Sequence, residues 1–468
     1  MVRGDKGLDD AIDWSYGVII DAGSTGSRLF LYKWQTVSDN HLIDIHPALD
    51  HSNKAVVKKA SPGLSSFANT PQNASGKWEG IYSWIAVNYI LGRFDVNGSH
   101  EVRQRSVGMI DVGGASLQIA IELNHENDMN DNYNVENVNL GCRDDSEMFR
   151  YRLFATTFLG YGVNEGIRKY EQLLSDRLFE SYNASHHQYV RDSCLPKNLV
   201  KTVSRKNGSQ FVRKGVGDWD NCLEEMNGLL DGSKSKECAT YLTSSTSTAT
   251  TAVPSCYLGQ VRSPHIDLSS MELYGFSELW FTTNDIFSLG GQYNFADFAT
   301  QSRLYCNSRW SAIQLRKRQN LYPKADEDRL RSQCFKSAWI AAILHKGFSL
   351  SKFKNRLKSV FDINGEEVQW TLGAMLHNMR YFPLRDMQRR NWLDKRRHLT
   401  TTNKSSIYVL LMIALCIILG IIWKSLVGSK NGLLRREPSI WGYMMLSQDQ
   451  SSLYQPSASA LYKLQSFS

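Results

Sequence analysis

Two short stretches, Asp21-Ala-Gly-Ser-Thr-Gly26 and Asp111-Val-Gly-Gly-Ala-Ser116, decide the fold of this chain of 468 residues. Each follows an apolar run and precedes another, which predicts a tight turn between two strands. The predicted strands cover residues 16–20, 28–34, 107–110 and 117–121. Glycines let the backbone approach a phosphate closely, and the free N–H groups of such a turn donate to its oxygens. One such turn is equally well explained as an ordinary hairpin, but the repeat predicts two lobes that clamp a polyphosphate.

The side chains of the two turns extend this prediction. Ser24 and Thr25 offer hydroxyl donors, and Asp21 and Asp111 each place a carboxylate at the end of a strand. Such a carboxylate can hold a hydrated divalent cation that counters the charge of a phosphate. The layout resembles the actin-like phosphotransferase fold of sugar kinases, actin and heat-shock ATPases. We therefore expect an α/β protein with a two-lobed actin-like (ribonuclease H-like) fold.

Composition excludes few classes of protein. The chain is 42% hydrophobic and 21% charged, as is usual for a globular protein, and its net charge is +8. Five basic residues gather within residues 389–397, directly before an apolar run, which is typical of a juxtamembrane segment. The sequence shows no nucleic-acid-binding signature, and we expect no nucleic-acid partner.

A third stretch identifies the kind of protein more closely. Residues 77–92 carry the pattern Glu-Gly-x-x-x-Trp-x-x-x-Asn-x-x-x-Gly on the periodicity of a helix, predicted over 78–91. This pattern resembles the third conserved region of the apyrases, the nucleoside triphosphate diphosphohydrolases, and the two turns resemble the first and fourth regions. Residues 334–339 and 370–376 resemble C-terminal signatures of the family. Phrases typical of its Golgi and lysosomal branch occur at residues 158–162, 274–278 and 368–373.

The resemblance implies a mechanism and a set of site residues. It implies that Glu79 is the general base, which takes a proton from the water that attacks the terminal phosphate; a helix-start carboxylate that favours the helix dipole is the structural alternative. It further implies that Asp21 and Asp111 hold a Ca²⁺ or Mg²⁺ ion through water. The residues implied to bind phosphate or its attendant waters are Ser24, Thr25, Gly26, Gly113, Gly114, Ala115, Ser116 and Gln118.

The nucleobase is harder to place from the sequence. In the family it stacks on an aromatic side chain beside an arginine, and local similarity points to Phe281 and Arg329. Core packing is the alternative explanation for Phe281. The implied function is the hydrolysis of nucleoside di- and triphosphates to monophosphates, which in a secretory lumen supports glycosylation.

One part of the family pattern is missing. The second conserved region, typically Thr-Ala-Gly-x-Arg, does not occur between Ser61 and Lys77. A first lobe without it buries less apolar area, exposes sheet edges and lacks an arginine near the phosphates. Two alternatives therefore stay open: a catalytically impaired nucleotide-binding membrane protein, from a splice variant or incomplete gene model, and an actin-like sugar or acid kinase.

Residues 407–427 form an apolar run that predicts a transmembrane helix at the short end of the usual range. Dispersed cysteines and five Asn-x-Ser sequons favour an oxidising lumen of the Golgi or another endomembrane. Residues 1–15 lack a signal-peptide pattern and the flanking charges favour the cytosol, so the orientation stays open. Seven cysteines outside the apolar run imply one unpaired thiol.

The expected organisation follows from these segments. We expect a first lobe over residues 16–75, to which residues 366–390 return, and a second lobe over 76–365. The remaining predicted segments are an N-terminal tail at 1–15, a stalk at 391–406 and a polar tail at 428–468.

Overall fold

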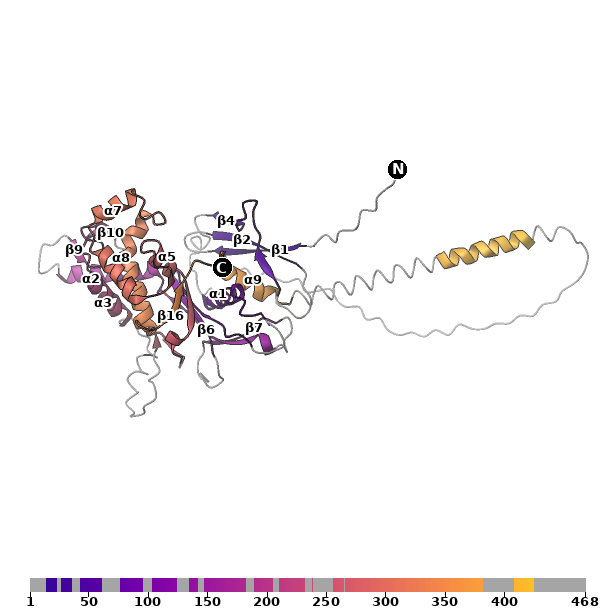
Figure 1. The fold of residues 1–468 in the computed structure, drawn as a ribbon, viewed down its shortest axis with the longest axis horizontal. Coiled ribbons are helices and arrows are strands. Elements are labelled where there is room, and N and C mark those ends of the chain that lie inside the picture. Colours follow the sequence, from indigo (N-terminus) through magenta and orange to yellow (C-terminus); the bar gives the residue numbers. More distant parts are fainter. Residues whose placement is uncertain are drawn as a thin grey trace, which may run out of the picture. The chain divides into compact units, whose positions relative to one another are not determined.

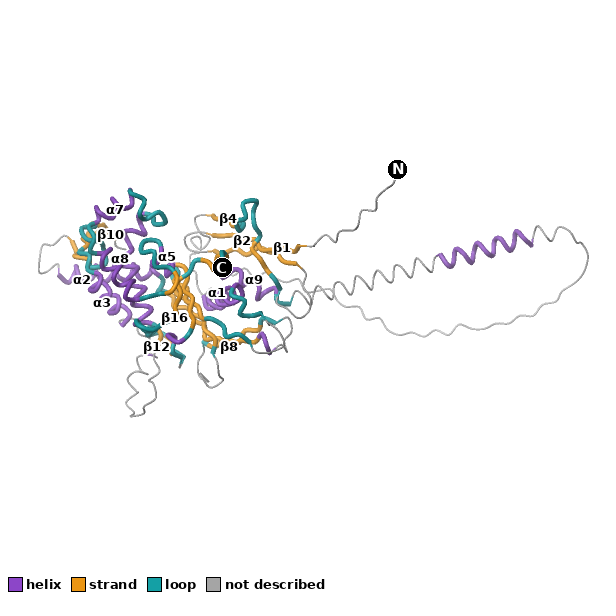
Figure 2. The backbone as a smooth tube through the Cα atoms, in the orientation of Figure 1, coloured by secondary structure: helices purple, strands orange, loops and turns teal. Residues whose placement is uncertain are grey.

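The computed structural model places most of the globular part of the chain (Figures 1 and 2). The residues that it describes are 14–22, 27–35, 43–60, 76–95, 103–123, 134–141, 147–181, 189–204, 210–231, 238, 256–264, 266–381 and 408–424. Two compact units divide the chain, residues 1–383 and 384–468. The predicted tails, the stalk, the threonine-rich loop at 243–253 and all five sequons lie outside the described residues.

A seven-stranded sheet organises the first unit, in the order β15-β16-β14-β5-β6-β8-β7. Its strands are β5 (Gly108–Val112), β6 (Ser116–Glu122), β7 (Val135–Asn139), β8 (Arg150–Leu159), β14 (Glu272–Ser277), β15 (Gly291–Gln292) and β16 (Arg356–Ser359). β14 runs parallel to both β5 and β16, and the other neighbours are antiparallel. The second predicted strand–turn–strand unit, residues 107–121, is therefore the β5–β6 hairpin.

A separate four-stranded sheet contains the first strand–turn–strand unit. β1 (Trp14–Ala22) pairs with β2 (Ser27–Gln35) along its whole length, from Trp14↔Gln35 to Ala22↔Ser27. β3 (Ile45–Pro47) and β4 (Val57–Ala60) both pair with β2. Both predicted strands of this unit are thus present, and residues 23–26 between them lie outside the described residues.

Two cores lie on opposite faces of the seven-stranded sheet, because alternate side chains of a strand point to opposite sides. Ile110 and Ile119 belong to one core, whereas their neighbours Met109 and Ala120 belong to the other. The helices of the first core are α2 (Val163–Ser181), α3 (Trp219–Asp231), α5 (Glu278–Asn284), α6 (Phe295–Cys306), α7 (Trp310–Arg318) and α8 (Glu327–Ala342), with the short 3₁₀ turn η4 (Leu268–Ser270) and the π turn η5 (Ile343–Gly347). The 3₁₀ turn η3 (Glu147–Phe149) packs against the second core through Phe149.

The second core joins the two sheets through a pair of helices. α1 (Gly76–Ile90) and α9 (Trp370–Met379) pack between them, together with Tyr32 and Trp34 of β2. A Cβ on Gly373 of α9 would come within 1.9 Å of the Tyr82 carbonyl oxygen, so these helices approach backbone to backbone. This close approach brings α9, from the end of the unit, against β1 at its start (Figure 1).

The sequence predicts that residues 148–172 are helical in part, with an interruption at residues 160–162. The structure confirms the helical part, which is α2 from Val163, and shows that the segment before the interruption is the strand β8. β8 lies between β6 and β7 and is buried on both faces. Three small sheets complete the unit: β9 (Tyr189–Asp192), β10 (Val200–Ser204) and β11 (Gln210–Gly215); β12 (Cys256–Tyr257) and β13 (Val261–Arg262); β17 (Asp362–Ile363) and β18 (Glu366–Glu367).

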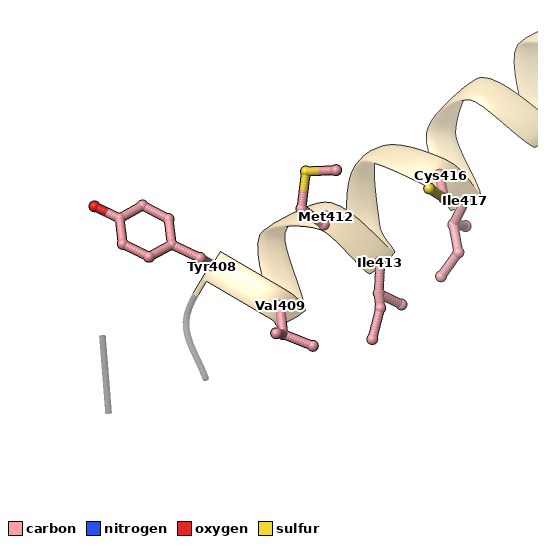
Figure 3. A pocket seen from close by; sticks show the side chains of 6 residues that line it. All are labelled: Tyr408, Val409, Met412, Ile413, Cys416 and Ile417. Atoms are coloured by element: carbon pink, nitrogen blue, oxygen red, sulfur yellow. The ribbon is translucent and has the colours of Figure 1, made fainter. Parts of the chain in front are cut away.

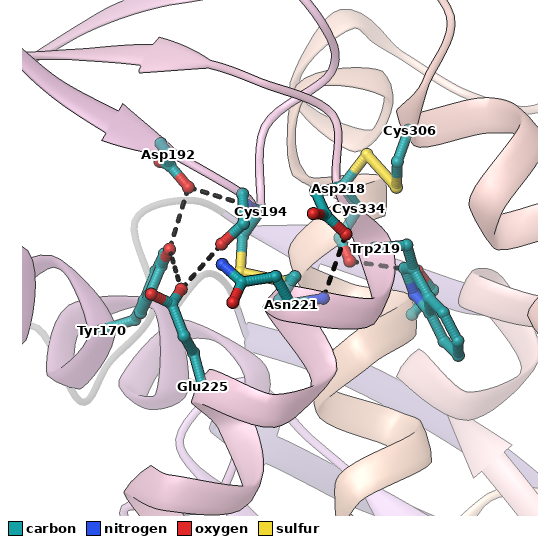
Figure 4. The surroundings of a disulfide bond; sticks show 12 residues. Tyr170, Asp192, Cys194, Asp218, Trp219, Asn221, Glu225, Cys306 and Cys334 are labelled. Atoms are coloured by element: carbon teal, nitrogen blue, oxygen red, sulfur yellow. Dashed lines mark hydrogen bonds between the residues drawn. A yellow bond between two sulfur atoms is a disulfide. The ribbon is translucent and has the colours of Figure 1, made fainter.

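Three disulfide bonds lie among the described residues. The bonded pairs are Cys194–Cys222, Cys238–Cys256 and Cys306–Cys334. Next to the first of them, the Tyr170 hydroxyl lies 2.9 Å from Asp192 Oδ1 and 2.7 Å from Glu225 Oε2 (Figure 4). The predicted unpaired thiol would be Cys142, which lies outside the described residues.

The predicted membrane span is not supported. Residues 408–424 form a helix, but among the described residues no helix is long and apolar enough to cross a membrane. Figure 3 shows a shallow apolar hollow on it, lined by its own side chains alone, which are Tyr408, Val409, Met412, Ile413, Cys416 and Ile417.

Candidate active site

Three carboxylates from three elements converge in the first unit. Asp21 lies at the end of β1, Glu79 in the first turn of α1, and Asp111 in β5. The pKa of each is raised by burial, and the negative charge of Asp21 further raises the pKa of both Glu79 and Asp111. Like charges that interact in this way lie close together. The structure therefore brings together three residues that the sequence assigned to one site.

Glu79 is the most strongly perturbed of the three. Burial first, and then the charges of Asp111 and Asp21, raise the pKa of its carboxyl to about 8. Its Oε2 lies 3.4 Å from Nε2 of Gln118, which also donates to Ser116 Oγ at 2.8 Å. A Cβ on Gly80 would come within 3.2 Å of the Gln118 side chain, so α1 packs closely enough against β6 to hold this contact.

The second turn presents its backbone in a fixed orientation. Its three carbonyl oxygens accept hydrogen bonds from the loop and helix that follow β8: Gly113 from Val163, Gly114 from Asn164, and Ala115 from Gly160. Within the described part of the chain, the amides of Gly114 and Ala115 donate no hydrogen bond. These two N–H groups are thus left to bind an anion, while the first N–H groups of α2 are satisfied by the turn.

Gly162 is required at the back of this turn. A Cβ there would lie 2.4 Å from the carbonyl carbon of Gly114 and 2.5 Å from the amide nitrogen of Ala115. Only a glycine permits that approach. In the sequence, Gly162 belongs to a motif typical of one branch of the family, and no role was predicted for it. In the structure, Gly162 packs against the backbone of the second turn.

The first turn is only partly described. Ser24, Thr25 and Gly26 lie outside the described residues, so their predicted phosphate contacts stay predictions. The two ends of the turn are placed: Asp21 pairs in register with Arg28, whose charge lowers the pKa of Asp21 against the effect of burial. A hydrogen bond from Trp370 of α9 acts in the same direction. Trp370 is thus a site neighbour whose role the sequence did not indicate.

Asp111 has an environment that suits a cation. Its Oδ1 is buried and has no hydrogen-bond partner among the described residues, and Ser277 is the side chain that hydrogen-bonds to the carboxyl group. Ser277 adopts φ 55°, a left-handed conformation that is uncommon for serine. No three His, Cys, Asp or Glu side chains in the described ranges are arranged to ligate a metal directly. The unpartnered carboxylate oxygen of Asp111 is the kind of donor that holds a hard cation or the water bound to it.

The two residues predicted to bind the base lie in contact with each other. The Arg329 guanidinium lies over the Phe281 ring at 4.4 Å from its centroid, and an ion pair with Asp285 fixes the arginine. Phe281 is one helical turn after Ser277, which hydrogen-bonds Asp111. The pair is therefore carried by the helix that begins at the carboxylate site, and the ring is half-buried instead of being enclosed in the core.

Comparisons with known proteins show the family of this chain. The chain matches the GDA1/CD39 (nucleoside phosphatase) family over residues 9–75 and 74–397. It is 43% identical to "Nucleoside-diphosphatase mig-23" of Caenorhabditis briggsae, covering 94% of this chain and 91% of that protein. It is 34% identical to "Nucleoside-triphosphatase ntp-1" of Caenorhabditis elegans, covering 86% and 80%. Among solved structures it resembles "nucleoside triphosphate hydrolases from Neospora caninum" with a TM-score of 0.48 at 14% identity, covering 79% and 93%.

The family match divides into two segments, and the alignment with the C. briggsae protein contains gaps in this chain. The two family segments meet at residues 74–75, between β4 and α1. The alignment with the C. briggsae protein runs over 522 residues, whereas 94% of 468 residues is about 440, so that about 80 aligned positions have no residue here. The break falls where the second conserved region is absent from the sequence.

Proposed function

The chain belongs to the GDA1/CD39 (nucleoside phosphatase) family, and from this membership and the carboxylate site we infer that it is a nucleotide hydrolase that acts on nucleoside di- and triphosphates. The observation that carries the inference is the convergence of Asp21, Glu79 and Asp111 beside the free amides of the second turn. The C. briggsae and C. elegans relatives are named as a diphosphatase and a triphosphatase, and both substrate classes are proposed for this chain.

We propose the following roles in catalysis. The amides of Gly114 and Ala115 bind oxygens of the terminal phosphate, and the Gln118 amide with the Ser116 hydroxyl orients a water molecule beside Glu79. Glu79 accepts a proton from that water as its oxygen bonds to phosphorus and the bond from phosphorus to the bridging oxygen breaks. The shorter nucleotide leaves with the electron pair of the broken bond. The rate increase comes from the positioning of the water and the phosphate and from stabilisation of the negative charge on the phosphate.

Asp21 and Asp111 would hold a Ca²⁺ or Mg²⁺ ion through water, and the ion would supply neutralisation of phosphate charge when bound. The buried Asp111 oxygen without a partner supports this assignment. Burial and the charges of Asp111 and Asp21 raise the pKa of Glu79, and a cation held by Asp21 and Asp111 would oppose those charges and favour the ionised form of the base. We propose further that the fold is the two-lobed actin-like type with a shortened first lobe.

The compartment we propose is an oxidising lumen such as that of the Golgi, where removal of nucleoside diphosphates supports glycosylation. Three disulfides among the described residues support it, because such bonds are rare in reducing compartments. Sensitivity of the expressed protein to an N-glycosidase, with loss of the shift when the sequon asparagines are replaced, would test this placement.

Release of inorganic phosphate by the purified full chain tests the activity. With a nucleoside diphosphate and Ca²⁺ or Mg²⁺, Glu79→Gln should lose at least about a hundredfold in rate and keep nucleotide binding. Glu327→Gln is the matched control, because Glu327 is also a first-turn carboxylate of a helix but is exposed. An unchanged rate in the Glu79 variant would refute the assignment of the base.

A second candidate is a nucleotide-binding protein with impaired catalysis. The break in the family match at residues 74–75 favours it, because the second conserved region, which the family resemblance places near the phosphates, is absent from the sequence there. The same experiment separates the two: binding without phosphate release in the unsubstituted chain would support the impaired form.

A further inference from the structure

The inner face of the four-stranded sheet changes from apolar to charged near the candidate site. Phe30, Tyr32 and Trp34 alternate along β2 and belong to the second core, together with residues of α1 and α9. Arg28 lies two residues before Phe30 on the same strand. Because successive side chains of a strand point to opposite faces, Arg28 lies on the face that carries the core residues. The apolar part of this face thus ends at Phe30, and Arg28 occupies the next position on it.

Asp21, Arg28 and Lys59 form a row across three strands of this face. Asp21 on β1 and Lys59 on β4 are the register partners of Arg28, one on each side of β2. Register partners share a face, with their Cβ atoms roughly 5 Å apart. Asp21 is one of the three carboxylates of the candidate site; burial raises its pKa, and the charge of Arg28 opposes that effect. The row therefore places two cations beside the site, one next to Asp21 and one a strand further away.

The needs of the sheet do not explain these two cations. Like charges in directly opposite positions destabilise a pair of strands. Burial raises the pKa of Glu367, just before α9, and the charges of Arg28 and Lys59 oppose that effect, but neither cation forms an ion pair within the part of the chain that the structure describes. The segments that adjoin the row, residues 23–26 and 61–75, contain no Asp or Glu. Both cations are exposed, so an anion can reach them from solvent.

From this row we propose that Arg28 and Lys59 bind the phosphate groups of the nucleotide. The inference rests on the proposed hydrolase function and adds to it the side chains that recognise the charge of the polyphosphate. An arginine donates paired N–H groups to phosphate oxygens, and a lysine adds a compact charge on a flexible stem. The sequence lacks the arginine that the family resemblance places near the phosphates, and the two cations supply positive charge on the first sheet without it.

Equilibrium binding of ADP and UDP to the full chain with Ca²⁺, at several concentrations of sodium chloride, tests the proposal. Lys59→Gln should raise the dissociation constant at least about tenfold at low salt and weaken its dependence on salt, because an ionic contact is lost. Lys59→Arg keeps the charge and should bind within about threefold of the unsubstituted chain. Lys58→Gln is the matched control: Lys58 is also exposed but lies on the other face, opposite Leu29, so its change should alter neither quantity.

Unchanged binding in Lys59→Gln would overturn the inference and leave the hydrolase function standing. Weaker binding with the salt dependence of the unsubstituted chain would also overturn it, since the lysine would then act through the fold, as would equal losses in Lys59→Gln and Lys58→Gln. An unsubstituted chain that binds neither nucleotide would refute the hydrolase function itself, and this inference with it. Should Lys59→Gln not fold, as judged by its melting curve, Arg28→Gln replaces it with the same expected changes and the same control.

Discussion

The side chains of Gln118 and Glu79 come from different elements and lie within hydrogen-bonding reach, with 3.4 Å between Gln118 Nε2 and Glu79 Oε2. Gln118 is 2% exposed and also donates to Ser116 and Thr157. The amide thus links the proposed base to the strand that follows the second turn. Because a donor to a carboxylate favours its ionised form, this contact bears on both the position and the pKa of Glu79.

Gln118→Ala should therefore lower the rate of phosphate release by about ten- to a hundredfold with little change in KM. It should also move the acidic limb of the pH–rate profile to higher pH, because Glu79 loses a donor to its charged form. Full kinetics across pH measure both effects. Gln172→Ala on α2 is the control, and a slower enzyme with an unmoved profile would show that Gln118 does not act through Glu79.

Gly162→Ala should disrupt the second turn. The added methyl group would lie 2.4 Å from backbone of Gly114, which must shift. We expect loss of at least about tenfold in phosphate release and about 1–3 kcal/mol in the free energy of unfolding. Gly228→Ala, in α3 with nothing within 4 Å of its Cβ, should instead be neutral or stabilise by about 0.5–1 kcal/mol. Denaturant unfolding measures the free energy of unfolding of both variants, and phosphate assays measure their rates of phosphate release.

How much of this site the sequence predicts depends on how far apart in the chain the interacting residues are. Local patterns sufficed for the β5–β6 hairpin and for α1, and the family resemblance suggested that Asp21, Glu79 and Asp111 share one site. Within residues 148–172 the local pattern predicted the helix but not the strand β8, which is set by its pairing with β6 and β7. The sequence did not indicate Ser277 or Trp370 as site residues. Ser277 hydrogen-bonds to Asp111 and Trp370 to Asp21, and both come from distant parts of the chain. The disulfide partners, likewise, are set by packing and not by spacing.

The free energy of unfolding should fall as pH rises in the presence of a chelator. The pKa of Glu79 is raised from 4.5 to about 8 in the folded protein, which therefore binds a proton that the unfolded chain releases. Stability is full below about pH 4.5 and is lost as pH rises towards 8, by an amount on the order of a few kcal/mol. Glu79→Gln should flatten this slope between pH 5 and 8. An identical slope in both proteins, measured by urea unfolding, would contradict the raised pKa.

Phe281→Ala should weaken nucleotide binding without slowing the chemical step. Stacking of a base on an aromatic ring contributes about 1–3 kcal/mol, so KM for a nucleoside diphosphate should rise by about ten- to a hundredfold while kcat is unchanged. Inorganic tripolyphosphate serves as the matched substrate, because it offers the phosphates without a base and its KM should not move. Arg329 lies 4.4 Å from the ring centroid and is held by Asp285, so Arg329→Ala should act in the same direction and leave Asp285 unpaired. If Phe281→Ala lowers the melting temperature but raises neither KM, the ring packs the protein and the base binds elsewhere.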